Sequence, residues 1–113
     1  MDPIDYRTQV FTVTADASTL NDHALLSRCV DELITVGNFT RIDGVSHQFK
    51  PQGITMVALL SESHIALHTW PERQTAKFVV ATCQNDPVPS KDLQRVLQFH
   101  LKASRILTSE INS

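Results

Sequence analysis

Hydrophobic and polar positions along this chain follow two different periods, and these predict an ordered series of strands and helices. Apolar residues at every second position indicate strands, whereas apolar residues three and four apart indicate helices. The alternating segments predict strands at Arg7–Thr14, Phe39–Phe49, Ile54–Ser61, His64–Trp70, Ala76–Cys83 and Arg105–Ile111. Gly44 predicts a bend or bulge, and the run from Pro51 to Gly53 predicts a turn.

Two segments with helical spacing interrupt these strands. The first predicted helix covers Asp22–Val36, with Asn21 as its N-cap and Gly37 after its last turn. The second begins at Ser90 as its cap, after a predicted loop over Gln84–Pro89. Each helix has one apolar face, formed by Leu25, Leu26, Cys29, Val30, Leu33 and Ile34 in the first and by Leu93, Val96, Leu97 and Leu101 in the second.

This order of elements predicts an α+β fold. Consecutive strands joined by short turns favour a mainly antiparallel sheet, with both helices packed on one face as a two-layer α/β sandwich. The 113 residues are expected to form a single domain, residues 1–113.

Composition and charge exclude several classes of function. A formal net charge of −2 gives no basic surface for nucleic acid. The longest apolar run, Met56–Leu60, is too short to cross a bilayer, and the first residues lack a signal peptide's pattern, so we expect a cytoplasmic protein that binds neither nucleic acid nor membrane. Cys29 and Cys83 form no disulfide framework and are expected to be free thiols.

The segment Ser61–Glu72 concentrates polar and reactive residues. In the simplest interpretation it contains a polar turn between two strands, with His64 and His68 on one strand face. A metal site is disfavoured, because four residues along a strand separate these histidines by ~13 Å. A serine hydrolase is also disfavoured, because no Gly-x-Ser-x-Gly elbow surrounds Ser63.

The motifs in this part of the chain resemble a known enzyme family. Glu62–His64, then His-Thr-Trp-Pro-Glu at His68–Glu72, then Thr82–Cys83, with an aromatic at Phe49, match in order and spacing. The resemblance is to the short prokaryotic class of pyruvoyl-dependent S-adenosylmethionine decarboxylase proenzymes.

The resemblance implies a self-cleaving chain. Cleavage between Glu62 and Ser63 would leave a β chain, residues 1–62, and an α chain, residues 63–113, whose first residue becomes a covalent pyruvoyl cofactor that forms a Schiff base with substrate. His68 would be the base in this processing. Thr55 stands where the family usually has a serine that assists it, and Cys83 would donate a proton during turnover. A buried structural thiol is the alternative for Cys83, although Cys29, on the apolar helix face, fits that alternative better.

The same resemblance implies a substrate and a place in metabolism. Phe49 and Trp70 would hold the adenine and the sulfonium, and Glu72 would bind the ribose hydroxyls. Decarboxylation of S-adenosylmethionine would then supply spermidine synthesis. From residue types alone, positions in the hydrophobic core are the favoured interpretation for Phe49 and Trp70.

Several residues beside the expected pocket depart from the family pattern. Arg73, Lys77 and Val79 replace aromatic, small or acidic residues, and Gln84 replaces a glycine. Two alternatives therefore stay open: a pyruvoyl-dependent arginine or ornithine decarboxylase, and a homologue that neither cleaves itself nor catalyses a reaction.

Strand parity predicts how the site is shared. On the strand His64–Trp70, His68 points to one face, and Ser63 points to the other if the alternation extends to it. One subunit would then not bring Ser63 and His68 together. We therefore expect a homodimer whose active sites are shared between protomers.

Overall fold

The computed structural model describes residues 6–83 and 88–112. Along the chain, its elements are β1 (Arg7–Thr14), α1 (Ala17–Leu20), α2 (His23–Val36), β2 (Arg41–Gln48), β3 (Ile54–Leu60), β4 (Ser63–Trp70), the 3-10 turn η1 (Pro71–Arg73), β5 (Thr75–Thr82), α3 (Ser90–Leu101) and β6 (Arg105–Asn112). The predicted strands and both long helices are confirmed.

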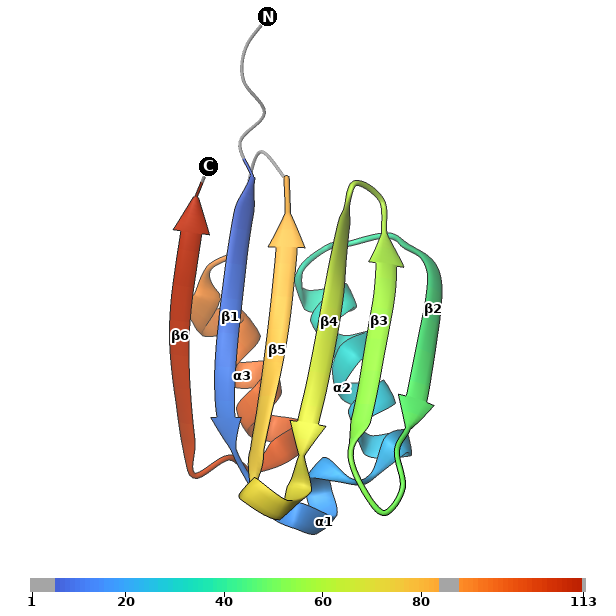
Figure 1. Cartoon of the computed structure of the whole chain (residues 1–113). Helices are drawn as coiled ribbons and strands as arrows, with labels where there is room; N and C mark the ends of the chain where they lie inside the picture. Colours follow the sequence, from blue (N-terminus) through green and yellow to red (C-terminus); the bar gives the residue numbers. More distant parts are fainter. Residues whose placement is uncertain (1–5, 84–87, 113) are drawn as a thin grey trace, which may run out of the picture.

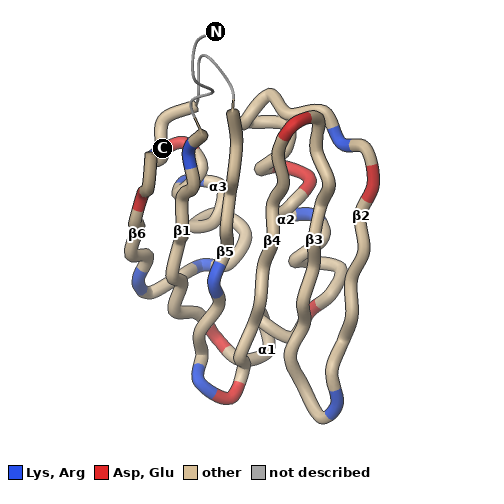
Figure 2. The backbone as a smooth tube through the Cα atoms, turned by 45° about the horizontal axis from the view of Figure 1, so that its top comes forward, with Lys and Arg blue, Asp and Glu red and all other residues tan. Residues whose placement is uncertain are grey.

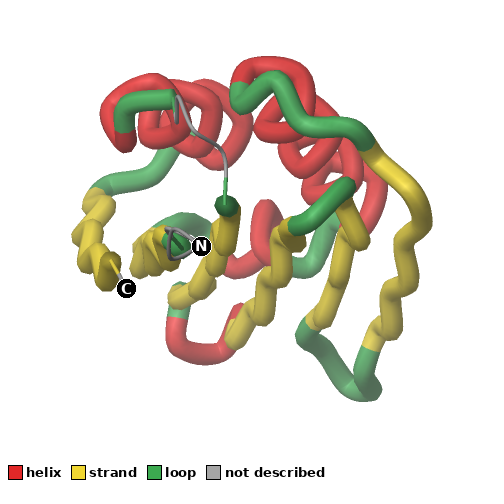
Figure 3. The backbone as a smooth tube through the Cα atoms, turned by 90° about the horizontal axis from the view of Figure 1, so that it is seen from above, coloured by secondary structure: helices red, strands yellow, loops and turns green. Residues whose placement is uncertain are grey.

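The six strands form one sheet in the order β2-β3-β4-β5-β1-β6, and each neighbouring pair is antiparallel. Helices α2 and α3 pack side by side on one face of this sheet, and no described element covers the other, which we call the open face (Figure 1; Figure 3). The predicted two-layer α+β fold is therefore confirmed. The β3–β4 turn, the end of β5 and the start of β1 lie at one end of the sheet, and η1 and α1 lie at the other (Figure 1).

The core lies between the helices and the sheet. Apolar side chains of both layers are almost fully buried there, among them Phe11, Phe78, Leu26, Leu33, Leu93 and Leu97. Burial of these side chains is the main favourable contribution to folding. Cys29, on α2, is 0% exposed, as expected for a structural thiol.

Strand β4 shows the alternation expected from its sequence. Ser63, Ile65 and Leu67 are buried on the helix-covered face, whereas His68 and Trp70 are exposed on the open face. Because successive side chains in a strand point to opposite faces, this parity fixes which residues can take part in one site.

The structure corrects two predicted helix caps. Asp22, not Asn21, caps α2, because its carboxylate accepts a hydrogen bond from the Leu25 N–H at 3.1 Å. The Asn21 side chain instead accepts one from the Gly53 N–H at 3.0 Å. Pro89 is the N-cap of α3, and Ser90 is the first helical residue.

Smaller differences concern the ends of elements. The predicted strand Phe39–Phe49 is shorter in the structure, and its bulge lies between Arg41 and Asp43, just before Gly44. Helix α1 was not predicted. Of the predicted loop Gln84–Pro89, residues 84–87 lie outside the described residues.

Charged residues of both signs are interspersed along the chain, and β3 and β4 carry no Lys, Arg, Asp or Glu (Figure 2). The described residues include no helix long and apolar enough to span a membrane.

Candidate active site

The predicted cleavage point lies in the turn between β3 and β4. Glu62 has a left-handed backbone conformation, with φ of +61°. This conformation is uncommon for residues other than glycine. Ser63 follows as the first residue of β4, only 9% exposed, and its hydroxyl donates to the Ser61 carbonyl at 3.3 Å. The Glu62–Ser63 peptide bond therefore lies where the chain leaves a sharp turn and enters the edge of the core.

Cys83 lies against this turn. Its thiol donates to the Glu62 carbonyl oxygen at 3.1 Å and lies 3.5 Å from the Glu62 carboxylate. The pKa of the Cys83 thiol is raised by partial burial, by the hydrogen bond to the Glu62 side chain and by the negative charge of Glu62. A thiol with a raised pKa stays protonated at neutral pH and can donate a proton. Glu62, Ser63 and Cys83 thus come together, and we call them the cleavage half-site.

The other predicted residues meet near the opposite end of the sheet. Phe49, Thr55, His68, Trp70 and Glu72 line one hollow of about 350 Å³, within the range of small-molecule sites. The Thr55 hydroxyl and His68 Nδ1 share a hydrogen bond at 3.0 Å, and the His68 and Trp70 rings have centroids 6.1 Å apart. We call these five residues the binding half-site.

Local chain geometry places the aromatic and acidic members of this half-site. Phe49 N–H donates to the Gly53 carbonyl at 2.8 Å, which closes the turn between β2 and β3. Pro71 ends β4, and η1 then carries Glu72 to the same hollow as Trp70. Phe49 is 48% exposed and Trp70 is 39% exposed, so the alternative that they are core residues is wrong.

The two half-sites of one chain do not meet. Ser63 and His68 are five residues apart on β4, which corresponds to ~17 Å along a strand, and their side chains lie on opposite faces. The strand parity predicted from the sequence is therefore present in the folded chain.

Lys77, whose role the sequence left open, lies beside the binding half-site. It is in register with His68 on the neighbouring strand, and its ammonium group donates to the Thr12 hydroxyl at 3.1 Å. With Arg73 and Thr75 it lines a second hollow of about 470 Å³, which also touches Trp70 and Glu72. Two of the departures from the family pattern, Arg73 and Lys77, thus lie next to the binding half-site.

Sequence reasoning missed His47. Its ring meets Phe49 edge-on, with centroids 4.6 Å apart, and it pairs with Thr55 across β2 and β3. The available signal was its position two residues before Phe49, which puts both on the same strand face. A third hollow, of about 400 Å³ between α2 and β2, holds the Asp31–Arg41 ion pair and none of the predicted site residues.

Relatives in sequence are decarboxylase proenzymes. The chain matches the family model described as S-adenosylmethionine decarboxylase over residues 10–113. It is 41% identical over 88 residues to the S-adenosylmethionine decarboxylase proenzyme of Synechococcus sp. strain WH7803, covering 78% of this chain and 68% of that protein. It is 36% identical over 92 residues to the proenzyme of Methanococcus maripaludis strain C5, covering 81% of this chain and 75% of that protein.

Solved structures agree with this result. The adenosylmethionine decarboxylase from Aquifex aeolicus VF5 superposes with a TM-score of 0.81 at 26% identity, over 98% of this chain and 91% of that one. The Trypanosoma brucei AdoMetDC monomer has a TM-score of 0.64 at 14% identity, over 92% of this chain and 44% of that one, and shows a shared fold alone. Sequence and structure together place this chain in the S-adenosylmethionine decarboxylase family.

Proposed function

We propose that this chain is a self-cleaving, pyruvoyl-dependent S-adenosylmethionine decarboxylase of polyamine synthesis, acting as a homodimer in the cytoplasm. One observation carries the proposal: the Cys83 thiol donates a hydrogen bond to the carbonyl of Glu62, next to the Ser63 hydroxyl. Self-cleavage at this bond requires a hydroxyl nucleophile, a carbonyl carbon for it to attack, and a hydrogen-bond donor to the carbonyl oxygen.

The first step is the attack of the Ser63 hydroxyl on the Glu62 carbonyl, which converts the peptide bond to an ester. Negative charge develops on the carbonyl oxygen, and the Cys83 hydrogen bond stabilises it. His68 of the second protomer, oriented by its hydrogen bond to Thr55, then removes the α-proton of residue 63, and the ester is eliminated with Glu62 leaving as a carboxylate. The dehydroalanine left at residue 63 takes up water and releases ammonia, which gives the pyruvoyl group.

The residues around Ser63 fit the pyruvoyl group that this cleavage would form. Residue 63 is nearly buried at the start of β4, beside a proton-bearing thiol. A pyruvoyl group there supplies a ketone that takes up the electron pair released with CO₂. Cys83 donates the proton that replaces the lost carboxylate, and its raised pKa keeps that proton in place at neutral pH.

The binding half-site supports S-adenosylmethionine as the substrate. Phe49 and Trp70 present two exposed aromatic faces for an adenine and a sulfonium, and Glu72 offers a carboxylate to the ribose hydroxyls. Arginine and ornithine have no ring or diol for these groups. The cationic residues Arg73 and Lys77 beside the same hollow are the observation that favours such an amino acid, whose carboxylate they could attract.

A homodimer would join the two half-sites. The open face carries exposed apolar side chains on both edges of the sheet, including Val45, Leu107 and Ile111, which a second copy would cover. Packing two open faces around a two-fold axis, with opposite ends together, would bring the β3–β4 turn of each protomer close to the binding half-site of the other.

Intact mass spectrometry of the purified chain tests self-cleavage. We expect a ~7 kDa fragment that ends at Glu62 and a ~5.5 kDa fragment with a blocked N-terminus, since conversion of Ser63 removes its amino group. A chain that stays whole in fresh and aged preparations would contradict the proposal and leave the non-catalytic homologue.

The substrate is tested with processed protein. CO₂ release is measured in parallel from S-adenosylmethionine, arginine and ornithine, and we expect it from S-adenosylmethionine alone. Release from either amino acid, with none from S-adenosylmethionine, would replace the substrate and leave the cofactor proposal standing.

A further inference from the structure

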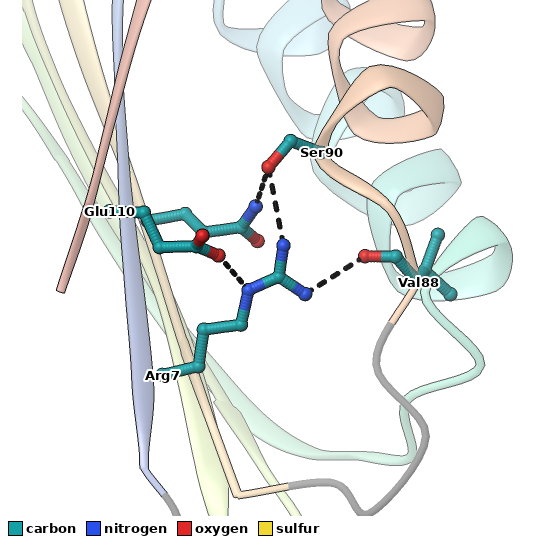
Figure 4. Close-up of polar contacts among 5 residues, drawn as sticks. Arg7, Val88, Ser90 and Glu110 are labelled. Atoms are coloured by element: carbon teal, nitrogen blue, oxygen red, sulfur yellow. Dashed lines mark hydrogen bonds and ion pairs between the residues drawn. The ribbon is translucent and has the colours of Figure 1, made fainter. Parts of the chain in front are cut away.

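A polar cluster lies beneath the sheet at the end that holds the cleavage half-site. The Arg7 guanidinium forms an ion pair with Glu110 through Nε and donates to the Val88 carbonyl at 3.1 Å and to the Ser90 hydroxyl at 3.2 Å (Figure 4). The Gln9 amide donates to the same hydroxyl. We call Arg7, Gln9, Val88, Ser90 and Glu110 the Arg7 cluster.

This cluster is built into the fold. Gln9 is 1% exposed, and the Arg7 side chain is 17% exposed. A partly buried guanidinium is stable only when its hydrogen bonds are satisfied, and here one arginine serves three acceptors on β6, α3 and the segment before α3. The planar fork of arginine suits such a task, whereas the point charge of lysine does not.

Arg7 also occupies a defined position relative to Cys83. Its backbone pairs with Thr82, the residue before Cys83, at the end of β5. Its side chain reaches Val88 and Ser90, which follow Cys83 and precede or begin α3. A single residue thus contacts the chain on both sides of Cys83: one residue before it at Thr82, and five and seven residues after it at Val88 and Ser90.

We propose that Arg7 is a positioning residue for the reaction at residue 63: by joining β5, β6 and the start of α3, it holds the Cys83 thiol on the Glu62 carbonyl. The catalytic part of this inference, an effect on the reaction at residue 63, rests on the proposed function. The structural part, that Arg7 fixes the position of Cys83, can be tested whether or not the chain cleaves itself.

Thiol alkylation provides that test. In Arg7→Met, which keeps most of the side-chain length and removes all the polar contacts, Cys83 should react with iodoacetamide about tenfold faster, since loss of a charge-assisted bond favours local opening. Cys29, fully buried on α2, is an internal control and should react at its original rate. Arg95→Met is the matched control, because it removes an arginine whose ion pair with Asp92 lies on the α3 surface.

Steady-state kinetics of the processed enzyme supply the second measurement. We expect kcat of Arg7→Met to fall about tenfold and KM to stay within about twofold, because the cluster touches the proton donor's chain and none of the substrate-binding residues. Arg7→Lys should resemble Arg7→Met, since its charge alone cannot serve three acceptors.

An unchanged Cys83 alkylation rate in Arg7→Met would overturn the inference, as would an unchanged kcat. If both cysteines of Arg7→Met become reactive together, that variant has lost its fold, and the test moves to Ser90→Ala. This variant removes one acceptor of Arg7, and it must raise the alkylation rate of Cys83 alone. Equal rates in Ser90→Ala and wild type would then overturn the proposal. Absence of self-cleavage and CO₂ release in the wild type is a separate result, and it rejects the proposed function.

Discussion

The two cysteines show how far the surroundings of a residue change its chemistry. Burial and the nearby Glu32 raise the pKa of the Cys29 thiol to about 12, which makes it inert at neutral pH. Cys83 also has a raised pKa, but its thiol is partly exposed and directed at Glu62. Position relative to the proposed cleavage bond, more than residue type, therefore distinguishes the proposed proton donor from the structural thiol.

The Glu62 carboxylate gives a testable pH dependence. Its charge contributes to the raised pKa of Cys83, so Glu62→Gln should lower that pKa toward its ordinary value. The reactive thiolate then forms at lower pH, and the midpoint of the alkylation rate of Cys83 against pH should move down. The measurement uses the Ser63→Ala background, in which the chain is expected to remain whole. A midpoint that stays or rises would show that Glu62 does not act on Cys83.

Single substitutions should separate cleavage from turnover. Ser63→Ala should abolish cleavage because the nucleophile is missing, and His68→Ala should stop it at or before elimination. Cys83→Ala should still be cleaved, although more slowly, and should lose most turnover or release a wrongly protonated product. Mass spectrometry and product analysis report these steps separately. Normal product from Cys83→Ala would remove this residue from the mechanism.

Glu72 belongs to the binding step alone in this scheme. Glu72→Gln removes the negative charge that would accept both ribose hydroxyls, so KM for S-adenosylmethionine should rise by about tenfold, the effect of weakening a charged hydrogen bond. Cleavage should be unaffected, because Glu72 lies in the other half-site from Glu62 and Cys83. An unchanged KM would remove Glu72 from substrate binding.

At the scale of elements, the β2–β3 turn positions Phe49 in the binding half-site. Gly53 has φ of +106°, and a Cβ added there would lie 3.2 Å from the Thr69 carbonyl oxygen and 4.0 Å from the Phe49 ring. Any side chain at residue 53 therefore strains the backbone and crowds the Thr69 carbonyl on β4, beside the turn that presents Phe49.

Gly53→Ala should lower the free energy of unfolding by ~1–2 kcal/mol, the cost of a strained left-handed residue, as measured by urea denaturation. Gly44→Ala is the matched control, since its added Cβ would be 3.4 Å from the Val57 carbonyl, an ordinary contact, without a positive φ. Equal losses in the two variants would show that backbone conformation at residue 53 is not the cause.

Elements with a regular period were predictable from the sequence, and those without one were not. The strand alternation on β4 and the apolar face of α2 repeat over several turns or residue pairs, so their existence follows from local pattern. Helix α1 has four residues, too few to show a period. Ser90 suited a cap locally, but its hydroxyl is bound to Arg7 and Gln9, more than eighty residues earlier, which no local pattern reveals.

At the scale of the whole molecule, strand parity predicted that Ser63 and His68 lie apart, but no single motif predicted that one hollow would hold five of the candidate residues. The sequence motif Ser63 to Glu72 is continuous, yet the folded strand separates its ends and turns its first and later residues to opposite faces. Under the proposed function, a complete site therefore takes residues from two copies of the chain, which is why we propose a homodimer.

Mixed dimers test that arrangement directly. Ser63→Ala and His68→Ala chains with different tags are co-expressed, so that the two kinds of chain can pair with each other as dimers form. Mixed dimers are then isolated through both tags. In a shared site, the intact Ser63 of one chain meets the intact His68 of the other, and the His68→Ala chain should be cleaved although neither variant is cleaved alone. The second site of each mixed dimer lacks both groups, so the Ser63→Ala chain stays whole. Mixed dimers without any cleavage would place Ser63 and His68 in one subunit's site, against the strand parity seen in β4.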